Sequence, residues 1–451
     1  MQQVADYLSQ KAYRNAFVRL WVLGLDGPTL REWERRCGDG QTFAMAKANC
    51  HATLDGEGRL DAQTVERSPL ALMQALDEYL FSGRSLSAPS LRRSNRASTQ
   101  YSEDGKQYWL VPVLLSNRRA AALSKQPGNL SHWVRHHCVL PTVTPHGVKV
   151  ALQHTQSTVD DKLHALWSAE MPSLKVWIAH LDDNAVVKGS TNQSAVGDWR
   201  ATHIEPGEDR MASLYRTVDQ AQAAGAQVIV FPELTIDVAQ RALLAKRLRQ
   251  QPVDHLVLIQ MGSFHETIAT ESKTFNTAPL VTALGRTVLT HRKLRAFSKV
   301  APDADPVTED ISLGDTLHIL ATPVGLLTVL ICKDFLDAHA SMLSLLSDAP
   351  VEWVLVPSFG NEKTVRLHKA RAKELGLVRT GSHTVLAQIF SNVDDPSRRP
   401  TECVRGFGHI GGKTSPEPQV PESGGLVVFP LQGEAPRKSP PRRSPNLKRV
   451  K

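Results

Sequence analysis

The stretch that decides the fold reads VLICKDF, from Val329 to Phe335, where an apolar run ends at a cysteine and two charged residues follow it. The run from Leu326 to Ile331 is long enough for a buried strand, and Gly325 before it marks a turn. From Asp337 onward the composition favours a helix. The pattern therefore predicts a core strand that delivers Cys332 to the start of a helix.

Two interpretations of Cys332 follow from this position. Free cysteine is among the most buried residue types, so a structural cysteine in the core is the first. In the second, the partial positive charge at the start of the helix favours the thiolate, which is the form that attacks carbon. The stretch alone leaves both open, and the rest of the chain has to decide between them.

Length and composition indicate a protein with a sizeable core. The 451 residues are 41% hydrophobic, which suits two or three domains. The sequence has no run of about 18 apolar residues. Its N-terminus has no basic flank leading into an apolar signal core. We therefore expect a protein without a membrane segment, located in the cytoplasm. The cysteines are odd in number and widely scattered, which argues against a disulfide framework and for a reducing compartment: Cys37, Cys50, Cys138, Cys332 and Cys403.

Much of the net charge of +8 lies at the C-terminal end of the chain. The segment from Arg437 to Lys451 carries seven Lys or Arg residues and no acid, which leaves only +1 for the rest. Because residues 433–451 are also rich in Ser and Pro, we expect a disordered basic tail. The tail could bind nucleic acid or an acidic protein, or be solvated without a specific ligand. A second basic zone, from Arg84 to Lys125, indicates an exposed loop.

Residues 1–170 form a region of unknown function that we expect to be mainly helical. Apolar residues recur at helical spacing as far as about residue 82, and Ser68-Pro69 supplies a cap and a first-turn proline. Residues 108–115 resemble a strand, and Pro112 within them suggests an edge position. A group of potential metal ligands lacks the spacing of a zinc module, so we expect no metal there: Cys37, Cys50, His51, His132, His136, His137 and Cys138.

From residue 174 onward, strand-like and helix-like segments alternate, as is typical of a layered α/β domain. The strand-like runs are residues 175–181, 227–231, 255–260, 275–281, 286–290, 326–331, 352–357 and 384–389. Three of these runs are followed closely by a residue with catalytic chemistry, namely Glu233, Lys293 and Cys332. Each alone would be an ordinary strand-end residue, and together they suggest one site.

The contexts of these residues resemble the three signatures of the nitrilase, or carbon–nitrogen hydrolase, superfamily. Glu233 follows Phe-Pro, Lys293 follows Arg after a hairpin that contains Asn276, and Cys332 stands between Ile and Lys-Asp. The resemblance covers about residues 173–432 and leaves residues 1–170 unexplained. It implies an αββα sandwich, usually dimerised, with a Glu-Lys-Cys triad and neither metal nor organic cofactor.

The resemblance also implies a role for each residue. Cys332 would attack an amide or nitrile carbon and form a thioester. Glu233 would transfer protons and later activate water. Lys293 would stabilise the oxyanion together with the backbone N–H that follows Cys332. Glu309 lies near the place where the family keeps a second glutamate, which positions the lysine and the substrate.

Other residues compete for some of these roles. Lys299 is a rival to Lys293, although the position of Lys293 directly after the hairpin strand favours it. Acidic neighbours in the same loop compete with Glu309: Asp303, Asp305 and Asp310. Lys333 stands where family members often have an aromatic or acidic residue. This cation could lower the pKa of the thiol or select an acidic substrate.

Two functions from different classes are therefore expected. In the first, the protein is a hydrolase that cleaves a non-peptide amide, an N-carbamoyl compound or a nitrile, as a homodimer or higher oligomer. In the second, the nitrilase-like domain is a scaffold or ligand-sensing subunit of a larger assembly, such as a nucleic-acid-associated or reverse-transcriptase-linked defence system. The set of strand-end catalytic residues favours the hydrolase.

Overall fold

The structure of the protein is a computed structural model that describes most of the chain. The described residues are 1–37, 40–56, 61–82, 100–112, 130, 133–134, 136–181, 186–191, 198–205, 207–252, 254–301, 304–336, 346, 351–379, 382–390, 406–411, 417–419 and 425–431. The basic tail expected at residues 433–451 and most of the basic zone between residues 84 and 125 lie outside them. The same holds for His132, Asp303 and Cys403.

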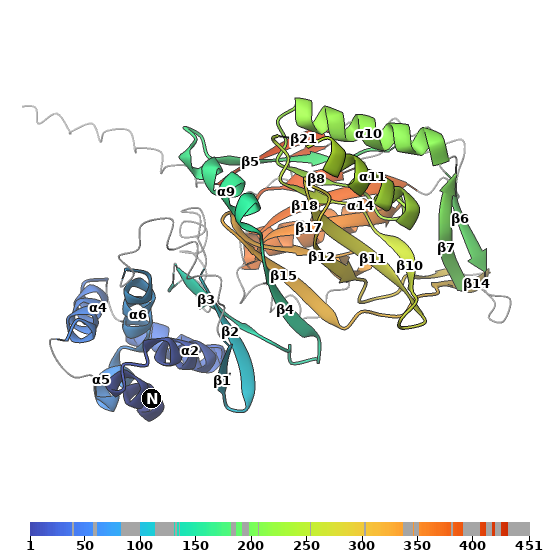
Figure 1. Cartoon of the computed structure of the whole chain (residues 1–451). Helices are drawn as coiled ribbons and strands as arrows, with labels where there is room; N and C mark the ends of the chain where they lie inside the picture. The colour runs from blue at the N-terminus through green and yellow to red at the C-terminus, as the bar shows by residue number, and fades with distance from the viewer. Residues whose placement is uncertain are drawn as a thin grey trace, which may run out of the picture.

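In the described part, two seven-stranded sheets pack face to face (Figure 1). The first has the order β10-β11-β9-β8-β5-β21 with β12 beside β11, and the second has the order β20-β19-β18-β17-β16-β15-β4. The first sheet consists of β5 (Ser173–Ile178), β8 (Val228–Val230), β9 (Leu258–Gln260), β10 (Phe264–Ile268), β11 (Lys273–Thr282), β12 (Thr287–Arg292) and β21 (Gly425–Pro430). The second consists of β4 (Lys149–His154), β15 (Thr316–Thr322), β16 (Gly325–Val329), β17 (Val351–Gly360), β18 (His383–Phe390), β19 (Gly406–His409) and β20 (Glu417–Gln419).

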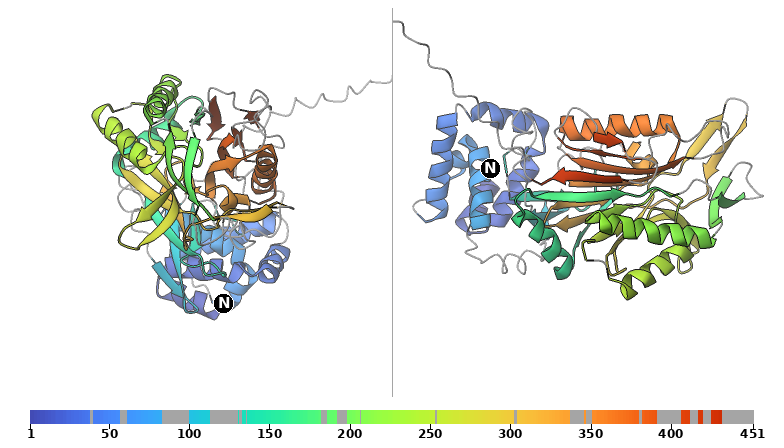
Figure 2. Two further views of the ribbon diagram at one scale, coloured as in Figure 1. Left: turned by 90° about the vertical axis from the view of Figure 1, so that its right-hand side faces the viewer. Right: turned by 90° about the horizontal axis from the view of Figure 1, so that it is seen from above.

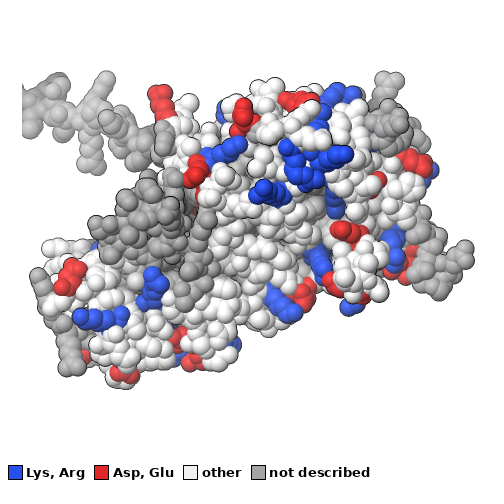
Figure 3. Space-filling model, viewed as in Figure 1, with Lys and Arg blue, Asp and Glu red and all other residues white. Residues whose placement is uncertain are grey.

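Helices α10 (Gly207–Ala223) and α11 (Val238–Gln250) cover the outer face of the first sheet. In β8, Val228 and Val230 pack between the sheets, whereas Ile229 packs outward under these helices. A strand buried on both faces must be apolar at every position, which explains its unbroken apolar sequence. Charged side chains of both signs lie on the outer surface over the helices (Figure 3).

Helix α14 (Glu362–Lys373) covers the outer face of the second sheet. Leu355 of β17 packs between the sheets, and Val354 packs outward in the cluster that includes Val365 of α14. The layers are therefore helix, sheet, sheet and helix, as the second view of Figure 2 shows. The αββα sandwich expected from the sequence is confirmed.

His368 of α14 is buried where the helix meets the second sheet. Its Nδ1 donates to the carbonyl oxygen of Thr364 at 2.8 Å, and its ring stacks on Phe335 with centroids 5.9 Å apart. Burial lowers the pKa of His368 to about 4, because the imidazolium would lose its hydration there. The ring is therefore neutral in the folded protein at pH 7.

A smaller sheet lies at the end of the sandwich opposite the N-terminal helices (Figures 1 and 2). Its strand order is β13-β14-β7-β6. The strands are β6 (Val186–Thr191), β7 (Asp198–Glu205), β13 (Ser298–Ala301) and β14 (Ala304–Glu309). Strands β7 and β14 run parallel, with Trp199 opposite Glu309. The smaller sheet therefore carries Glu309, which the sequence had placed near the site.

The N-terminal region is helical up to residue 82, as expected, and continues into a sheet of order β1-β2-β3. Its elements are α1 (Gln2–Ser9), α2 (Tyr13–Gly24), α3 (Gly27–Arg36), α4 (Gly40–Leu54), α5 (Ala62–Arg67), α6 (Pro69–Ser82), β1 (Gln100–Glu103), β2 (Lys106–Pro112) and β3 (His137–Pro141). The expected edge position of the strand with Pro112 is wrong, because β2 lies between β1 and β3. Pro112 is the last residue of β2, where it interrupts the ladder only at its margin.

Strand β4 and helix α9 (Ser157–Ala165) precede the domain boundary expected at residue 173. Even so, β4 pairs in parallel with β15 of the second sheet, where Val150 lies opposite Leu317 and both are buried. The segment before residue 173 thus supplies an edge strand to the sandwich. The division into domains at that residue stays a prediction.

The histidines near residue 137 have structural partners. Asp77 of α6 is buried, and His137 Nδ1 donates to one of its oxygens at 2.9 Å while the His136 N–H donates to the other at 3.0 Å. These bonds tie α6 to β3. Among the described residues, no group of three or more His, Cys, Asp or Glu side chains is placed to hold a metal ion. No helix in the described part is long and apolar enough to cross a membrane.

We predict that His368 makes the stability of the protein fall in mild acid. The unfolded chain binds a proton on this histidine near the ordinary histidine pKa of 6.5, whereas the folded chain binds it only near pH 4, so stability is lost as pH falls between these values. Between pH 7 and pH 5 this loss should be about 2 kcal/mol. Urea unfolding at both pH values should show a smaller loss in His368→Gln, and an equal loss in both proteins would contradict the prediction.

Candidate active site

Lys293 lies between two carboxylates at the centre of the candidate site. Its Nζ is 2.8 Å from Glu233 Oε1 and 2.7 Å from Glu309 Oε2. These three side chains are only 2% to 3% exposed. The structure therefore brings together residues that are 60 and 16 positions apart in the sequence.

A tight crossing of two loops positions Glu233 after β8. The Leu234 N–H donates to the carbonyl oxygen of Ser263 at 2.7 Å, and Leu234 has a positive φ of 57°. The neighbouring Gly262 has a φ of 61°, and a Cβ there would lie 2.2 Å from the carbonyl oxygen of Pro232. Only glycine fits this approach, which brings the segment after β9 against the Glu233 turn.

Cys332 lies in a strained turn three residues beyond β16, directly before the short helix α12 (Lys333–Leu336). Its φ is 40°, which is uncommon for a residue other than glycine. The Cys332 N–H donates to the carbonyl oxygen of Pro357 at 2.9 Å, so β17 holds the turn in place. Strain of this kind persists where the surroundings fix the conformation, and it is common at active sites.

Phe359, near the end of β17, links Cys332 to Glu233. Its N–H donates to Glu233 Oε2 at 3.0 Å, and its carbonyl oxygen lies 3.7 Å from Cys332 Sγ, from which it accepts the thiol hydrogen. On the other side of the sulfur, Ser358 Oγ donates to Sγ at 3.4 Å. The thiol and the carboxylate therefore share one backbone residue as a common support.

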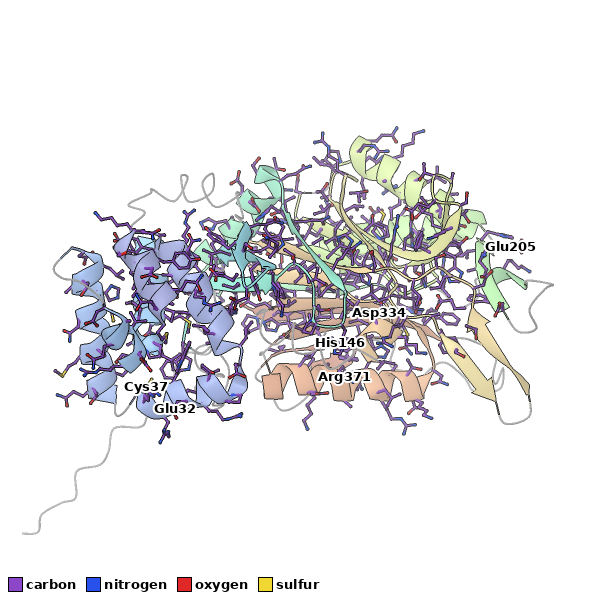
Figure 4. All side chains as sticks on the ribbon, turned by 90° about the horizontal axis from the view of Figure 1, so that it is seen from below. Glu32, Cys37, His146, Glu205, Asp334 and Arg371 are labelled. Atoms are coloured by element: carbon purple, nitrogen blue, oxygen red, sulfur yellow. The ribbon has the colours of Figure 1, made fainter. Side chains whose placement is uncertain are left out.

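Asp334 joins the cysteine turn to the lysine loop. Its Oδ1 accepts from the N–H groups of Leu294 at 3.0 Å and Arg295 at 2.9 Å, and its Oδ2 accepts from His291 Nε2 at 3.0 Å. The Asp334 side chain is fully buried, and Figure 4 shows it inside the sandwich. One carboxylate thus fixes the position of the lysine loop relative to Cys332.

His265 and Asn276 complete the hydrogen bonds of the carboxylates. His265 Nδ1 accepts from the Ala201 N–H at 2.8 Å, so its Nε2 carries the proton that it donates to Glu309 Oε1 at 2.9 Å. Asn276 Nδ2 donates to Glu233 Oε1 at 3.0 Å and to Glu309 Oε1 at 2.8 Å. Sequence reasoning missed these roles and that of Asp334, although a polar Asn276 in a buried apolar strand was a signal.

The charges of the site hold the carboxylates and the lysine in defined states. Burial alone would lower the pKa of Lys293, but Glu233 and Glu309 more than compensate and raise it. Burial would raise the pKa of Glu309, but Lys293 and His265 outweigh it and hold that pKa well below its usual range. Glu233 differs, because burial prevails over Lys293 and raises its pKa.

The expectation that the helix start lowers the pKa of Cys332 is wrong. Burial and the nearby charge of Glu233 raise the pKa of this thiol to about 12, against the smaller opposing effects of Lys293 and Ser358. A buried thiolate beside a carboxylate is costly, and the helix that follows has only four residues. The Cys332 thiol is therefore neutral at pH 7.

The rival residues do not occupy the centre of the site as far as the structure describes them. Asp310 pairs with Arg200 at 2.6 Å instead of with Lys293. The side chains of Lys299 and Asp305, like the whole of Asp303, lie outside the described residues. Lys293 and Glu309 are thus the residues that the structure brings to Glu233.

Comparison with known proteins gives one family. The model of the family described as carbon-nitrogen hydrolase matches residues 189–346, a segment that contains Glu233, Lys293, Glu309 and Cys332. This match confirms the resemblance to the nitrilase superfamily that the sequence indicated. No curated protein matches the chain.

The chain is also similar to several solved structures. Nit3 of Saccharomyces cerevisiae, a member of branch 10 of the nitrilase superfamily, is 15% identical over 58% of this chain and 91% of its own, with a TM-score of 0.40. The NitFhit protein of C. elegans is 15% identical over 57% and 60%, with a TM-score of 0.39. An amidase from Nesterenkonia sp. is 16% identical over 57% and 91%, with a TM-score of 0.38.

We predict that Asp334→Ala destabilises the protein by about 3 kcal/mol or more, because it leaves buried donors without an acceptor. Asp315→Ala is the matched control, since Asp315 pairs with Lys149 on the surface, where both side chains are more than 60% exposed. The Asp315→Ala variant should lose less than about 1 kcal/mol of the free energy of unfolding. Urea unfolding followed by tryptophan fluorescence measures both, and similar small losses would contradict the proposed function of Asp334 as a buried tie.

Proposed function

We propose that the carbon–nitrogen hydrolase domain of this chain cleaves a non-peptide amide through a thioester on Cys332. In this proposal Glu233 transfers the protons, and Lys293, held by Glu309, stabilises negative charge. The observation that carries the proposal is the buried ammonium of Lys293 between two carboxylates, one of which shares Phe359 with the thiol. The family match over residues 189–346 supports it independently.

The first half of the reaction forms the thioester. As Cys332 Sγ attacks the carbonyl carbon, Glu233 takes the thiol proton, and a new S–C bond forms in a tetrahedral intermediate. Glu233 then gives this proton to the nitrogen, the C–N bond breaks, and ammonia or an amine leaves. A neutral thiol beside an ionised carboxylate suits this step, because proton transfer and attack occur together.

The second half hydrolyses the thioester. Glu233, ionised again, takes a proton from water as the water oxygen attacks the acyl carbon. The C–S bond then breaks, the carboxylic acid leaves, and Glu233 returns the proton to the sulfur. The sum is one amide and one water converted to one acid and one ammonia or amine.

Lys293 supports both halves by stabilising the oxyanion. Its charge is already balanced by Glu233 and Glu309 within a buried site, so it is oriented before the substrate binds. The backbone N–H of Lys333, directly after Cys332, is the second donor in this proposal. His265 and Asn276 keep Glu309 and Glu233 in place, so they are positioning residues.

The same residues would also serve for an N-carbamoyl compound or a nitrile, which differ in the carbon that the sulfur attacks. The alternative of a scaffold or ligand-sensing subunit gains no support from the family match. The expected homodimer, the contact of the basic tail with nucleic acid or an acidic protein, and the cytoplasmic location stay predictions.

We predict that Cys332 is the thiol that reacts fastest with 2-chloroacetamide, and that Glu233 is the reason. Intact-mass spectrometry after brief treatment should show one adduct, absent in Cys332→Ala and much slower to form in Glu233→Gln. Ammonia release from amides should fall at least about a thousandfold in Cys332→Ala. Cys50, whose pKa burial raises to about 11, is the internal control, and adducts there or at Cys138 in place of Cys332 would contradict the assignment.

We predict that Asn276→Ala moves the acidic limb of the pH profile of kcat/KM to higher pH. Glu233 must be ionised to act as a base, and its raised pKa puts this limb above the ordinary glutamate value of 4.5. The Asn276 amide donates to the charged form, so its loss disfavours that form and raises the pKa of Glu233 further. Asn49→Ala, in α4, is the matched control. An unchanged or lower limb in Asn276→Ala would refute this assignment of the base.

A further inference from the structure

The backbones of Phe297 and Phe359 donate to the carboxylates of the site, and Trp199 pairs with Glu309 in the small sheet. The Phe359 N–H donates to Glu233 Oε2 at 3.0 Å, and the Phe297 N–H donates to Glu309 Oε2 at 2.8 Å. Trp199 lies opposite Glu309 in the pairing of β7 with β14. These aromatic residues come from separate elements, and their side chains have no part in the chemistry proposed above.

The pairing of β7 with β14 places the Trp199 side chain on the face of the small sheet that is directed toward the site. Residues opposite each other in neighbouring strands project to the same face of a sheet. Glu309 projects toward Lys293, so Trp199 projects to that face as well. The ring of Trp199 lies 5.5 Å from the ring of His265, which itself donates to Glu309.

The Phe359 ring belongs to the same apolar surface. Along β17 the side chain of Leu355 faces the space between the sheets, and Phe359, four residues later, faces the same way at the strand end. There Phe359 and Trp199 pack against a small buried cluster that is distinct from the main core: Ala201, Ile204, Leu234 and Phe264. Leu234 directly follows Glu233, so this cluster adjoins the catalytic base.

These rings retain surface that a ligand could cover. The Phe297 side chain is 46% exposed, and Trp199 and Phe359 are half-buried. Large apolar side chains left exposed beside a buried polar cluster are typical of a binding site, where apolar walls surround a small number of placed polar groups.

The charges of the site act against an anionic substrate. At its centre, Lys293 is already paired with the carboxylates of Glu233 and Glu309. A carboxylate on the substrate would lie close to these two carboxylates in a buried setting, where charges are weakly screened. Lys333, half-buried next to Cys332, is the cation that would favour the opposite preference.

We propose that Trp199 and Phe359 bind the acyl side chain of the substrate and select an uncharged apolar or aromatic group over one that ends in a carboxylate. This inference rests on the proposed amide hydrolysis and adds the substrate class. It assigns specificity to the β7–β14 sheet and to the end of β17, outside the residues that do the chemistry.

The test compares primary amides that differ only in the acyl side chain. Ammonia release gives kcat/KM for acetamide, phenylacetamide and succinamate with the full-length protein. Phenylacetamide should exceed succinamate at least about tenfold, the gain expected from burying an aromatic ring. The ratio of phenylacetamide to acetamide should fall about tenfold in Trp199→Ala and in Phe359→Ala, mainly through KM.

Controls separate a binding effect from damage to the fold. Trp199→Leu keeps an apolar side chain against the Ala201 cluster and should lower the same ratio, while Trp109→Ala in β2 removes a tryptophan far from the site and should leave it unchanged. Lys333→Ala should still cleave phenylacetamide in preference to succinamate. If the ratio of phenylacetamide to acetamide is the same in Trp199→Leu and Phe359→Ala as in the unmodified protein, the inference is overturned.

The outcomes also distinguish this inference from the proposed function. Rapid cleavage of succinamate in preference to phenylacetamide, lost in Lys333→Ala, overturns the inference and leaves the hydrolase proposal in place. Ammonia release from none of the amides, together with no reaction of Cys332 with 2-chloroacetamide, refutes the hydrolase proposal and the inference with it.

Discussion

The buried ammonium of Lys293 is the constraint on which the rest of the site depends. A charge without water is costly unless it is paired and hydrogen-bonded, so Glu233 and Glu309 must both reach it. Glu233 follows β8, Lys293 follows β12, and Glu309 ends β14, so segments from both the first sheet and the smaller sheet have to converge. The fold is thereby tied to one ion cluster, which forms only when these segments converge.

The second sheet brings Cys332 to this cluster through two supports. Asp334 fixes the lysine loop relative to the cysteine turn, and Phe359 bonds to both the Cys332 thiol and the Glu233 carboxylate. Neither the Asp334 side chain nor the Phe359 backbone reacts in the proposed mechanism. Their effect is to hold reacting atoms from two sheets in one geometry, which lowers the entropic part of the barrier.

The sequence predicted the sandwich and the positions of Glu233, Lys293 and Cys332, because each follows an apolar run whose end a strand pattern can locate. It did not predict the partners of Asp334 or the tautomer of His265, since these depend on contacts between distant segments. The pKa of Cys332 was misjudged for the same reason: burial and the Glu233 charge decide it, and neither is visible along the chain. Strand β4 likewise joins β15 across a long stretch of sequence.

The parallel pairing of β7 with β14 has an evolutionary consequence. It places Trp199, which we propose to contact the substrate, next to Glu309, the counter-charge of Lys293, in one sheet. A lineage that reshaped this strand pair for a new substrate would also disturb the charge balance of Lys293. Substitutions of single side chains beside the site are therefore an easier route to new specificity than insertions or register shifts. In this small sheet we expect side chains to diverge more than the backbone.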